Sequence, residues 1–203
     1  MINIGILAST KATDMQGLID AIESKKIDAK ISVLISNKKE AYAITRAKEH
    51  NIKSVIIESK GREREEFDRE VASVLEENGV ELILLIGYMR ILSGFFVNKY
   101  KNKIMNIHPS LLPAFAGGMD KDVHLEILNS GVKVTGCTLH FVDESVDGGP
   151  IIMQKSVDIS IDETVESLKE KVQKAEQEVI VKSVKLYSEG KIEVKDNKVK
   201  ISK

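Results

Sequence analysis

Cysteine, proline and tryptophan are scarce in this sequence, and their scarcity limits what the protein can be. One Cys and 4 His among 203 residues exclude a disulfide framework, and their spacing does not fit a metal site. The chain has 3 Pro and no Gly- or Ser-rich stretch that would link two domains. We therefore expect one domain over residues 1–203, without a metal, in a reducing compartment.

An excess of charge of one sign is also missing. The 30 Lys and Arg residues nearly balance the 31 Asp and Glu residues, which leaves a net charge of −1. Such a chain has no general positive field to attract nucleic acid or an anionic membrane surface. The apolar stretch at 80–97 contains Glu81 and Arg90, so it is not a membrane span. We expect a cytoplasmic protein that binds neither nucleic acid nor membrane.

The first half of the sequence alternates short apolar runs with segments of helical periodicity. The runs are almost continuous in Ile, Val and Leu, which is typical of parallel strands covered on both faces. This β-α-β-α order predicts a doubly wound, Rossmann-like parallel sheet over residues 1–108. The predicted strands are 2–8, 29–35, 54–57, 82–86 and 104–107, and the predicted helices are 15–26, 39–50 and 64–78.

The second half, residues 109–203, has a different pattern. Two apolar runs flank a Gly-Gly-Pro turn, and we expect them to extend the sheet with antiparallel strands. The fold class is therefore α/β, a mostly parallel sheet with antiparallel strands added in the C-terminal half. The predicted elements are strands 132–142 and 151–159 around a turn at 147–150, a helix at 162–187, and a hairpin or solvated tail at 191–203.

Candidate catalytic side chains lie where one predicted strand ends. The segment Asn106-Ile107-His108-Pro109 closes that strand, and ligands of open α/β sheets bind beyond the carboxyl ends of the strands. Asn106 and His108 are two residues apart and so point to the same side. An imidazole moves protons near neutral pH and an amide N–H stabilises an oxyanion, a pair suited to reaction at a carbonyl. The alternative is a strand-end histidine held by backbone groups.

An acidic turn follows the predicted strand at 132–142. Gly148 and Gly149 in this turn would let the backbone approach a ligand closely. The turn offers three carboxylates that compete for an acidic role, namely Asp143, Glu144 and Asp147. Its spacing alone does not choose among them.

Together these two segments resemble the folate-dependent formyltransferases. The combination of His-Pro-Ser-Leu-Leu-Pro at 108–113 with Asp-Gly-Gly-Pro at 147–150 is highly specific, and weaker matches extend the resemblance over about residues 2–190. It is closest to the members that act on a purine precursor. The resemblance implies transfer of the formyl group of 10-formyltetrahydrofolate to the amine of 5′-phosphoribosylglycinamide. The weaker matches are Arg64, residues 87–93, residues 136–143 and Gln173-Lys174-Ala175-Glu176.

The resemblance also implies roles for individual residues. His108 becomes the proton-transfer residue, Asn106 holds the formyl oxygen, and Asp147 supports His108. His140, on the neighbouring strand, either shapes the crevice or takes part in catalysis. The implied contacts to 10-formyltetrahydrofolate come from Arg64, Met89, Arg90, Ile91, Leu92, Asn106, Asp143, Glu144, Ser145, Val146 and Asp147.

The predicted phosphate loop departs from the family, which usually has Gly-x-Gly-Ser-Asn after the first strand. Both glycines are replaced, and Asp14 stands where Asn is usual. A carboxylate facing a phosphate would repel it, whereas Asp14 or Thr13 as a helix N-cap would leave the phosphate to hydroxyls, backbone N–H groups and Lys11. A loop with a purely structural role, or a changed nucleotide partner, is the alternative. The predicted loop consists of Thr10, Lys11, Ala12, Thr13 and Asp14.

Two other regions concern the substrate. Gln173 and Glu176 are one helical turn apart, so they share a face and are expected to bind ribose hydroxyls or the substrate amine. Gly117 and Gly118 predict a mobile flap within residues 115–123. His124, which follows that flap, is interpreted as a histidine on a helix surface.

Other functions compete with this one. They are a formyltransferase acting on a sugar nucleotide, a 10-formyltetrahydrofolate hydrolase, and a non-catalytic folate or nucleotide binder. A hydrolase is expected to need an additional N-terminal domain, and a tRNA-directed relative a basic C-terminal one. A pure binder has no need of Asn106, His108 and Asp147 together. We expect small-molecule substrates as the partners, and a monomer or homodimer.

Overall fold

The computed structural model describes residues 1–117 and 121–202 of the chain. Its strands and helices follow one another in the order that the sequence predicts, with two additional short helices. In chain order the elements are β1 (Ile2–Ala8), α1 (Met15–Glu23), β2 (Ala29–Ser36), α2 (Tyr42–Glu49), β3 (Ser54–Ile56), α3 (Arg64–Glu77), β4 (Leu82–Leu85), α4 (Gly94–Lys99), β5 (Ile104–His108), α5 (Lys121–Asn129), β6 (Val134–Phe141), β7 (Ile151–Asp158), α6 (Val165–Ser188), β8 (Ile192–Lys195) and β9 (Lys198–Ile201).

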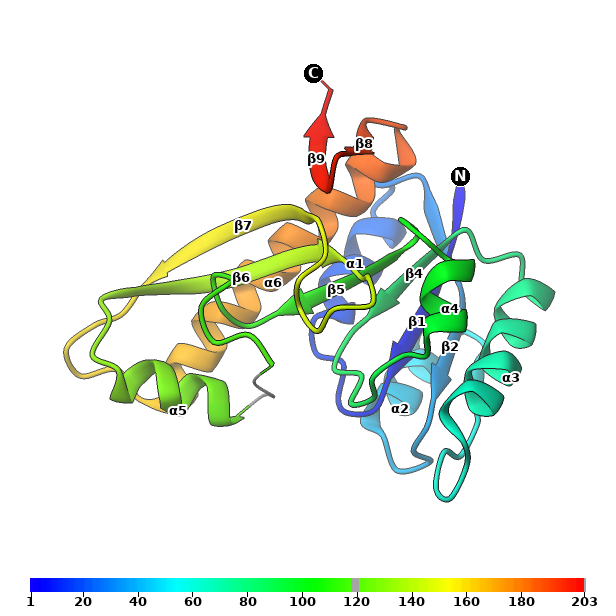
Figure 1. The fold of residues 1–203 in the computed structure, drawn as a ribbon, viewed down its shortest axis with the longest axis horizontal. Helices are drawn as coiled ribbons and strands as arrows, with labels where there is room; N and C mark the ends of the chain where they lie inside the picture. Colours follow the sequence, from blue (N-terminus) through cyan, green and yellow to red (C-terminus); the bar gives the residue numbers. More distant parts are fainter. Residues whose placement is uncertain (118–120, 203) are drawn as a thin grey trace.

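A central sheet organises the molecule (Figure 1). Within the described residues it has seven strands in the order β3-β2-β1-β4-β5-β6-β7. The first five strands are parallel, while β6 is antiparallel to both β5 and β7. This topology confirms the predicted fold class. The strand order reverses between β1 and β4, and such a switch point leaves a crevice beyond the carboxyl ends of the strands.

Alternating side chains of the buried strands supply a hydrophobic core on each face of the sheet. In β1, Ile4 and Ile6 join one buried cluster and Leu7 joins the other, as expected from the period of two along a strand. The first cluster contains residues of α1, α2, α5 and α6, and the second contains residues of α3 and α4. The first cluster therefore draws on both halves of the chain. This shared core supports the single domain, which stays a prediction.

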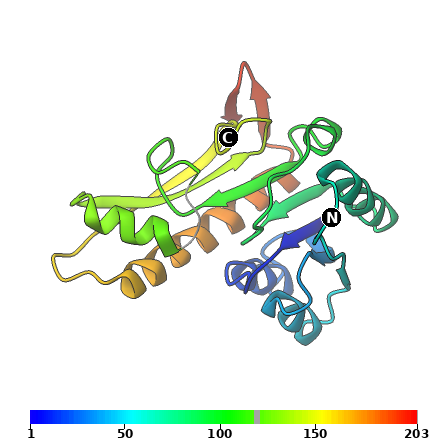
Figure 2. The ribbon, with the colours of Figure 1, turned by 60° about the horizontal axis from the view of Figure 1, so that its bottom comes forward.

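Helix α6 is the long helix predicted from the charge-rich amphipathic segment. Its N-terminus is fixed by a capping box, in which the Thr164 hydroxyl accepts from the Ser167 N–H and the Ser167 hydroxyl accepts from the Thr164 N–H. The helix lies against β6, β7 and α1 (Figure 2). After α6 the chain forms the hairpin β8-β9, so the hairpin alternative is confirmed over the solvated tail. Asp196 and Asn197 form its turn, both in the left-handed region.

The element bounds differ from the predictions in a few places. Helix α2 begins at Tyr42 rather than residue 39, and α4 and α5 have no predicted range. Helix α4 is short and depends on its surroundings: the Ser93 hydroxyl accepts from the Phe96 N–H, while the Ser93 N–H donates to the buried Asp68 carboxylate. Gly118 of the predicted flap lies outside the described residues. None of the helices in residues 1–117 and 121–202 is long and apolar enough to cross a membrane.

Candidate active site

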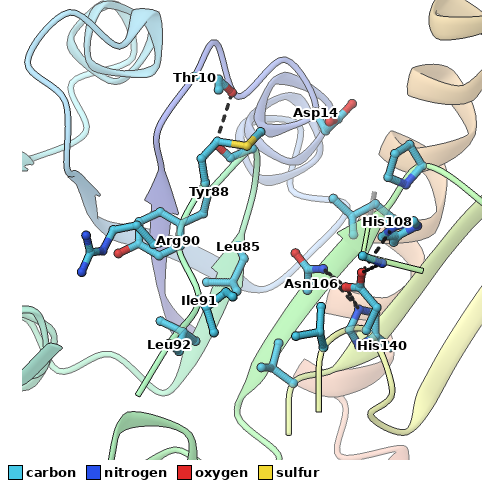
Figure 3. A pocket seen from close by; sticks show the side chains of 18 of the residues that line it. Thr10, Asp14, Leu85, Tyr88, Arg90, Ile91, Leu92, Asn106, His108 and His140 are labelled. Atoms are coloured by element: carbon cyan, nitrogen blue, oxygen red, sulfur yellow. Dashed lines mark hydrogen bonds and ion pairs between the residues drawn. The ribbon is translucent and has the colours of Figure 1, made fainter. Parts of the chain in front are cut away.

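A cavity of about 1020 Å³ opens beyond the carboxyl ends of β1, β4 and β5. All the predicted site residues line it, although they come from both halves of the chain. Figure 3 shows Asn106, His108 and His140 grouped together, with Tyr88, Ile91 and Leu92 across from them. The predicted residues in its lining are Thr10, Lys11, Ala12, Thr13, Asp14, Arg64, Met89, Arg90, Ile91, Leu92, Asn106, His108, His140, Asp143, Glu144, Ser145, Val146, Asp147, Gln173 and Glu176.

Strand register brings Asn106 and His140 together. Asn106 of β5 lies directly opposite His140 of antiparallel β6, so their side chains share one face of the sheet. The Asn106 Nδ2 atom is 3.2 Å from His140 Nε2. On its other side, His140 Nδ1 is 3.0 Å from the carbonyl oxygen of Phe141. A carbonyl only accepts, so His140 carries a hydrogen on Nδ1; when the ring is neutral, its Nε2 accepts from Asn106.

Asp147 comes from the loop between β6 and β7. Its backbone is in the left-handed region, with φ 54°, which Asp tolerates better than most residues. One carboxylate oxygen, Oδ2, is 3.3 Å from His108 Nε2 and accepts from the Gly117 N–H at 2.9 Å. The other, Oδ1, is 3.6 Å from His140 Nε2 and 3.5 Å from Asn106 Nδ2. Asp147 thus lies between the two imidazoles and the amide.

These neighbours also set the charge of Asp147. Burial acts to raise its pKa, but hydrogen bonding with His140 and the Gly117 N–H, together with the charges of His108 and His140, outweighs burial. The pKa of Asp147 is therefore lowered from its ordinary value, and the carboxylate is ionised at neutral pH. An ionised carboxylate beside two histidines is suited to holding protonated imidazole in place.

The other two candidate carboxylates of this loop have different partners. Asp143 accepts from the N–H and hydroxyl of Ser145, and Glu144 accepts from the Asn98 amide at 2.7 Å. Within the described residues, Asp147 is the carboxylate of the loop that contacts the imidazoles. Geometry therefore distinguishes among residues that the sequence pattern leaves equivalent.

The two glycines after Asp147 serve the fold of the loop itself. A Cβ at Gly149 would collide with the carbonyl oxygen of Phe141, and one at Gly148 with the Ser145 hydroxyl. Neither glycine lines the cavity. These glycines make room for the chain's own backbone and a neighbouring side chain, and their close approach to a ligand stays a prediction.

The wall opposite the histidines is apolar with basic groups at its edge. Met89, Ile91 and Leu92 follow β4 and line the cavity, as does the half-buried Tyr88. The Arg90 guanidinium stacks on the buried Phe67 ring, 4.3 Å from its centroid, and Arg64 is exposed in the first turn of α3. This arm of the cavity suits a flat aromatic ligand that carries negative charge at one end.

The loop after β1 forms the other arm of the cavity. It is tied to the segment after β4 by the Ser9 N–H, which donates to Gly87 O at 2.9 Å, and by the Met89 N–H, which donates to the Ser9 hydroxyl at 2.8 Å. Ala12 has φ 45°, so an alanine occupies a left-handed position at which glycine is strain-free. The loop keeps a glycine-like shape although its glycines are replaced.

Asp14 occupies the N-cap position of α1, but its side chain makes no capping hydrogen bond. Of the two predicted N-cap candidates, Asp14 is therefore confirmed by position, although its carboxylate does not cap the helix. It is instead 8% exposed and hydrogen-bonded to Glu176, and its Oδ1 atom has no hydrogen-bond partner among the described residues. Burial raises the pKa of Asp14 to about 6, even though Glu176 and the cations Lys169 and Arg46 act to lower it.

Two basic side chains of the cavity escape the sequence prediction. His124 is 2% exposed and lines the cavity, so its interpretation as a surface histidine is wrong; α5 turns it inward. Lys169 also lines the cavity, and a sequence signal for it exists. It precedes Gln173 by four residues and Glu176 by seven, a spacing that places all three on one face of α6. In the part of the chain described here, no His, Cys, Asp or Glu side chains group closely enough to hold a metal ion.

Comparisons with known proteins identify the family. A family model described as formyl transferase matches residues 2–184. Phosphoribosylglycinamide formyltransferase of Haemophilus influenzae is 37% identical over 198 residues, 97% of this chain and 92% of the relative. The trifunctional purine biosynthetic protein adenosine-3 of Gallus gallus is 42% identical over 194 residues, or 95% of this chain. This chain covers 19% of that longer relative, about a fifth of its length.

Solved structures agree with the sequence matches. Glycinamide ribonucleotide transformylase 1 from Symbiobacterium toebii superposes with a TM-score of 0.95 at 36% identity, over 100% of this chain and 95% of the other. A formyltetrahydrofolate deformylase from Pseudomonas syringae has a TM-score of 0.91 at 26% identity, over 100% of this chain and 66% of the other. With the family model covering nearly the whole chain, the resemblance read from the sequence is confirmed: the chain belongs to the formyl transferase family.

Proposed function

We propose that this chain transfers the formyl group of 10-formyltetrahydrofolate to the amine of 5′-phosphoribosylglycinamide, a step of purine biosynthesis. The observation that carries the proposal is the convergence of Asn106, His108, His140 and Asp147 at one end of the cavity, where each has a side-chain atom 3.2–3.6 Å from an atom of at least one of the others. A binding site for a folate or a nucleotide alone would not require this group. The proposal includes action in the cytoplasm as a monomer or homodimer.

The chemistry needs charge stabilisation and proton transfer at one carbon atom. When the amine attacks the formyl carbon, negative charge develops on the formyl oxygen, and an N–H of the Asn106 amide can hydrogen-bond to it. His108 takes a proton from the attacking amine or gives one to the departing nitrogen at Nε2. The ionised Asp147 stabilises the protonated ring, since its Oδ2 lies 3.3 Å from that nitrogen.

The apolar arm suits the folate. A folate is a flat ring system with a carboxylate tail, and the arm combines Met89, Ile91 and Leu92 with the edge cations Arg64 and Arg90. Arg forks pair well with carboxylates, and apolar walls exclude water from the ring. Bound there, 10-formyltetrahydrofolate would supply the transferable formyl group. Residues 143–147, which face the same cavity, complete the proposed folate site.

The other arm would hold the phosphorylated substrate. The loop Thr10–Asp14 precedes the N-terminus of α1, a position that favours anions, and Lys11 adds an exposed cation. Gln173 and Glu176 of α6 face the same space and can bind hydroxyl groups of a ribose. The buried Asp14 carboxyl repels a phosphate only when the carboxyl is ionised. Its pKa of about 6 makes the ionised form less favoured than it is in an exposed Asp.

A formyl-transfer assay tests the proposal. Purified protein is incubated with 10-formyltetrahydrofolate, and formation of tetrahydrofolate is followed with and without 5′-phosphoribosylglycinamide. We expect formation that depends on the acceptor. Equal formation without acceptor would indicate hydrolysis, the reaction of the deformylase that shares this fold. Formation only with an amino sugar nucleotide would reassign the acceptor, and no formation with any acceptor would indicate a binding protein.

A further inference from the structure

Ser110 lies directly behind His108 in a position that the proposed reaction does not explain. Its side chain is completely buried, two residues after the end of β5. The Ser110 Oγ atom is 3.0 Å from His108 Nδ1 and 2.6 Å from the carbonyl oxygen of Ala114. The hydroxyl therefore connects the imidazole to the backbone of the following loop.

The direction of these two hydrogen bonds follows from their chemistry. A carbonyl oxygen cannot donate, so at 2.6 Å the single hydroxyl hydrogen of Ser110 must point to Ala114 O. The same hydroxyl can then only accept from the ring. The His108 Nδ1 atom must carry a hydrogen, both when the ring is neutral and when it is charged. In the neutral ring the basic lone pair is consequently on Nε2, the nitrogen 3.3 Å from Asp147.

We propose that Ser110 is a positioning residue that holds neutral His108 in the tautomer with its hydrogen on Nδ1, so that protons are gained and lost at Nε2. This inference rests on the proposed function for its catalytic meaning. Without the hydroxyl, either ring nitrogen can hold the hydrogen, and the fraction of enzyme with its base aimed at the reacting atoms falls.

The surrounding backbone makes Ser110 a rigid partner. The Thr138 hydroxyl donates to Ser110 O at 2.7 Å and accepts from the Leu112 N–H at 3.0 Å. The Gln154 amide donates to Leu112 O at 3.0 Å and to the Thr138 hydroxyl at 2.9 Å. These bonds tie the segment after β5 to β6 and β7, so the Ser110 hydroxyl cannot follow the ring if the ring rotates.

Nitrogen NMR of the histidine rings tests the proposal directly, because ¹⁵N chemical shifts distinguish the two tautomers. With 4 His in the chain, His108 is assigned by its loss in His108→Ala. We expect neutral His108 of the wild type to carry its hydrogen on Nδ1, and Ser110→Ala to populate the Nε2–H form. A wild-type ring protonated on Nε2, or an unchanged tautomer in Ser110→Ala, would overturn the proposal.

Kinetics give the catalytic consequence. Ser110→Ala should lower kcat on the order of tenfold, the effect of one lost hydrogen bond, with KM for both substrates nearly unchanged. Ser110→Thr, which keeps the hydroxyl, should retain both tautomer and rate; if it fails to fold, the NMR result on Ser110→Ala decides. Ser183→Ala is the matched control, since Ser183 is equally buried on α6 and far in the chain from the imidazole.

The two proposals fail separately. The wild type could transfer no formyl group while Ser110→Ala still loses the Nδ1–H tautomer of His108. That result would reject the proposed reaction and support the positioning role of Ser110. An active chain in which Ser110→Ala shifts the tautomer but leaves kcat unchanged would overturn the role of Ser110 in catalysis.

Discussion

Asp14 is the residue at which the pH of the solution should act most clearly on the stability of this fold. Its carboxyl group is buried at the start of α1, beside Glu176 and Lys169 of α6 and Arg46 of α2, and its pKa is raised to about 6 chiefly because burial disfavours the charged form. In the unfolded chain the same group has the ordinary value of 3.8. Between these two values the folded protein keeps a proton that the unfolded chain has lost.

The sign and size of the effect follow from linkage. The folded state binds the Asp14 proton more tightly than the unfolded chain does. This proton binding therefore contributes its full amount to the free energy of unfolding below pH 3.8, and the contribution is lost as the pH rises through about 6. A difference of about two pKa units corresponds to about 3 kcal/mol. Asp14→Asn keeps the shape and removes the ionisation. Relative to wild type, the variant should therefore gain about 3 kcal/mol in unfolding free energy between pH 3.5 and pH 7.

Urea unfolding at a series of pH values measures this difference. In thermal unfolding of a domain of this size, the same gain corresponds to about 6–12 °C. The Tm of Asp14→Asn minus that of wild type should therefore be larger at pH 7 than at pH 3.5 by this amount. Asp196→Asn is the matched control, because Asp196 is exposed in the β8-β9 turn and Asn tolerates the same left-handed backbone. It should change stability less than Asp14→Asn at neutral pH.

A flat difference between Asp14→Asn and wild type from pH 4 to pH 7 would refute the reasoning. Because Asp14 is hydrogen-bonded to Glu176, the pair shares its protons. If Glu176→Gln, rather than Asp14→Asn, removed the pH dependence, the proton retained on folding would belong to Glu176. The assignment to Asp14 would then be wrong.

The remaining predictions concern turnover in the formyl-transfer assay. His108→Ala should lower kcat by roughly 10²–10⁴, the usual contribution of a general acid or base; near-normal turnover would remove His108 from the reaction. Asn106→Ala should lower kcat on the order of 10²–10³ if its amide stabilises the oxyanion, and a change confined to the KM for the folate would contradict that role. Lys11→Ala should raise the KM for the ribonucleotide more than the KM for the folate, whereas equal effects would place the phosphate elsewhere.

The parts of the fold that the sequence predicts are those with a strong period or composition. The continuous apolar runs of β1, β2 and β4 indicate buried parallel strands, and the long amphipathic pattern indicates α6. Helix α4 is missed because six residues hold less than two turns, and its start depends on the Asp68 carboxylate, which is distant in the sequence. Local pattern predicts elements that depend on their own residues, and fails where a tertiary contact fixes the element.

The same distinction applies to the site. Asn106 and His108 are found from two-residue spacing at a strand end, but the pairing of Asn106 with His140 depends on the register between β5 and β6. That register is set by the whole sheet and not by any short segment. The inward position of His124 likewise depends on how α5 packs. Spacing therefore predicts which residue types are available, and packing decides which of them meet.

Two aspartates of the cavity show why residue type alone does not assign a role. Asp147 is half-buried and Asp14 is buried, yet the pKa of the first is lowered and that of the second is raised. Asp147 accepts a hydrogen bond from a backbone N–H and faces two imidazoles, and these neighbours favour its charged form. Asp14, by contrast, has an Oδ1 atom without a hydrogen-bond partner among the described residues. One carboxyl is thereby kept charged beside the proposed proton-transfer residue. The other is brought closer to neutrality, in the arm proposed to hold the phosphorylated substrate, whose negative charge an ionised Asp14 would oppose.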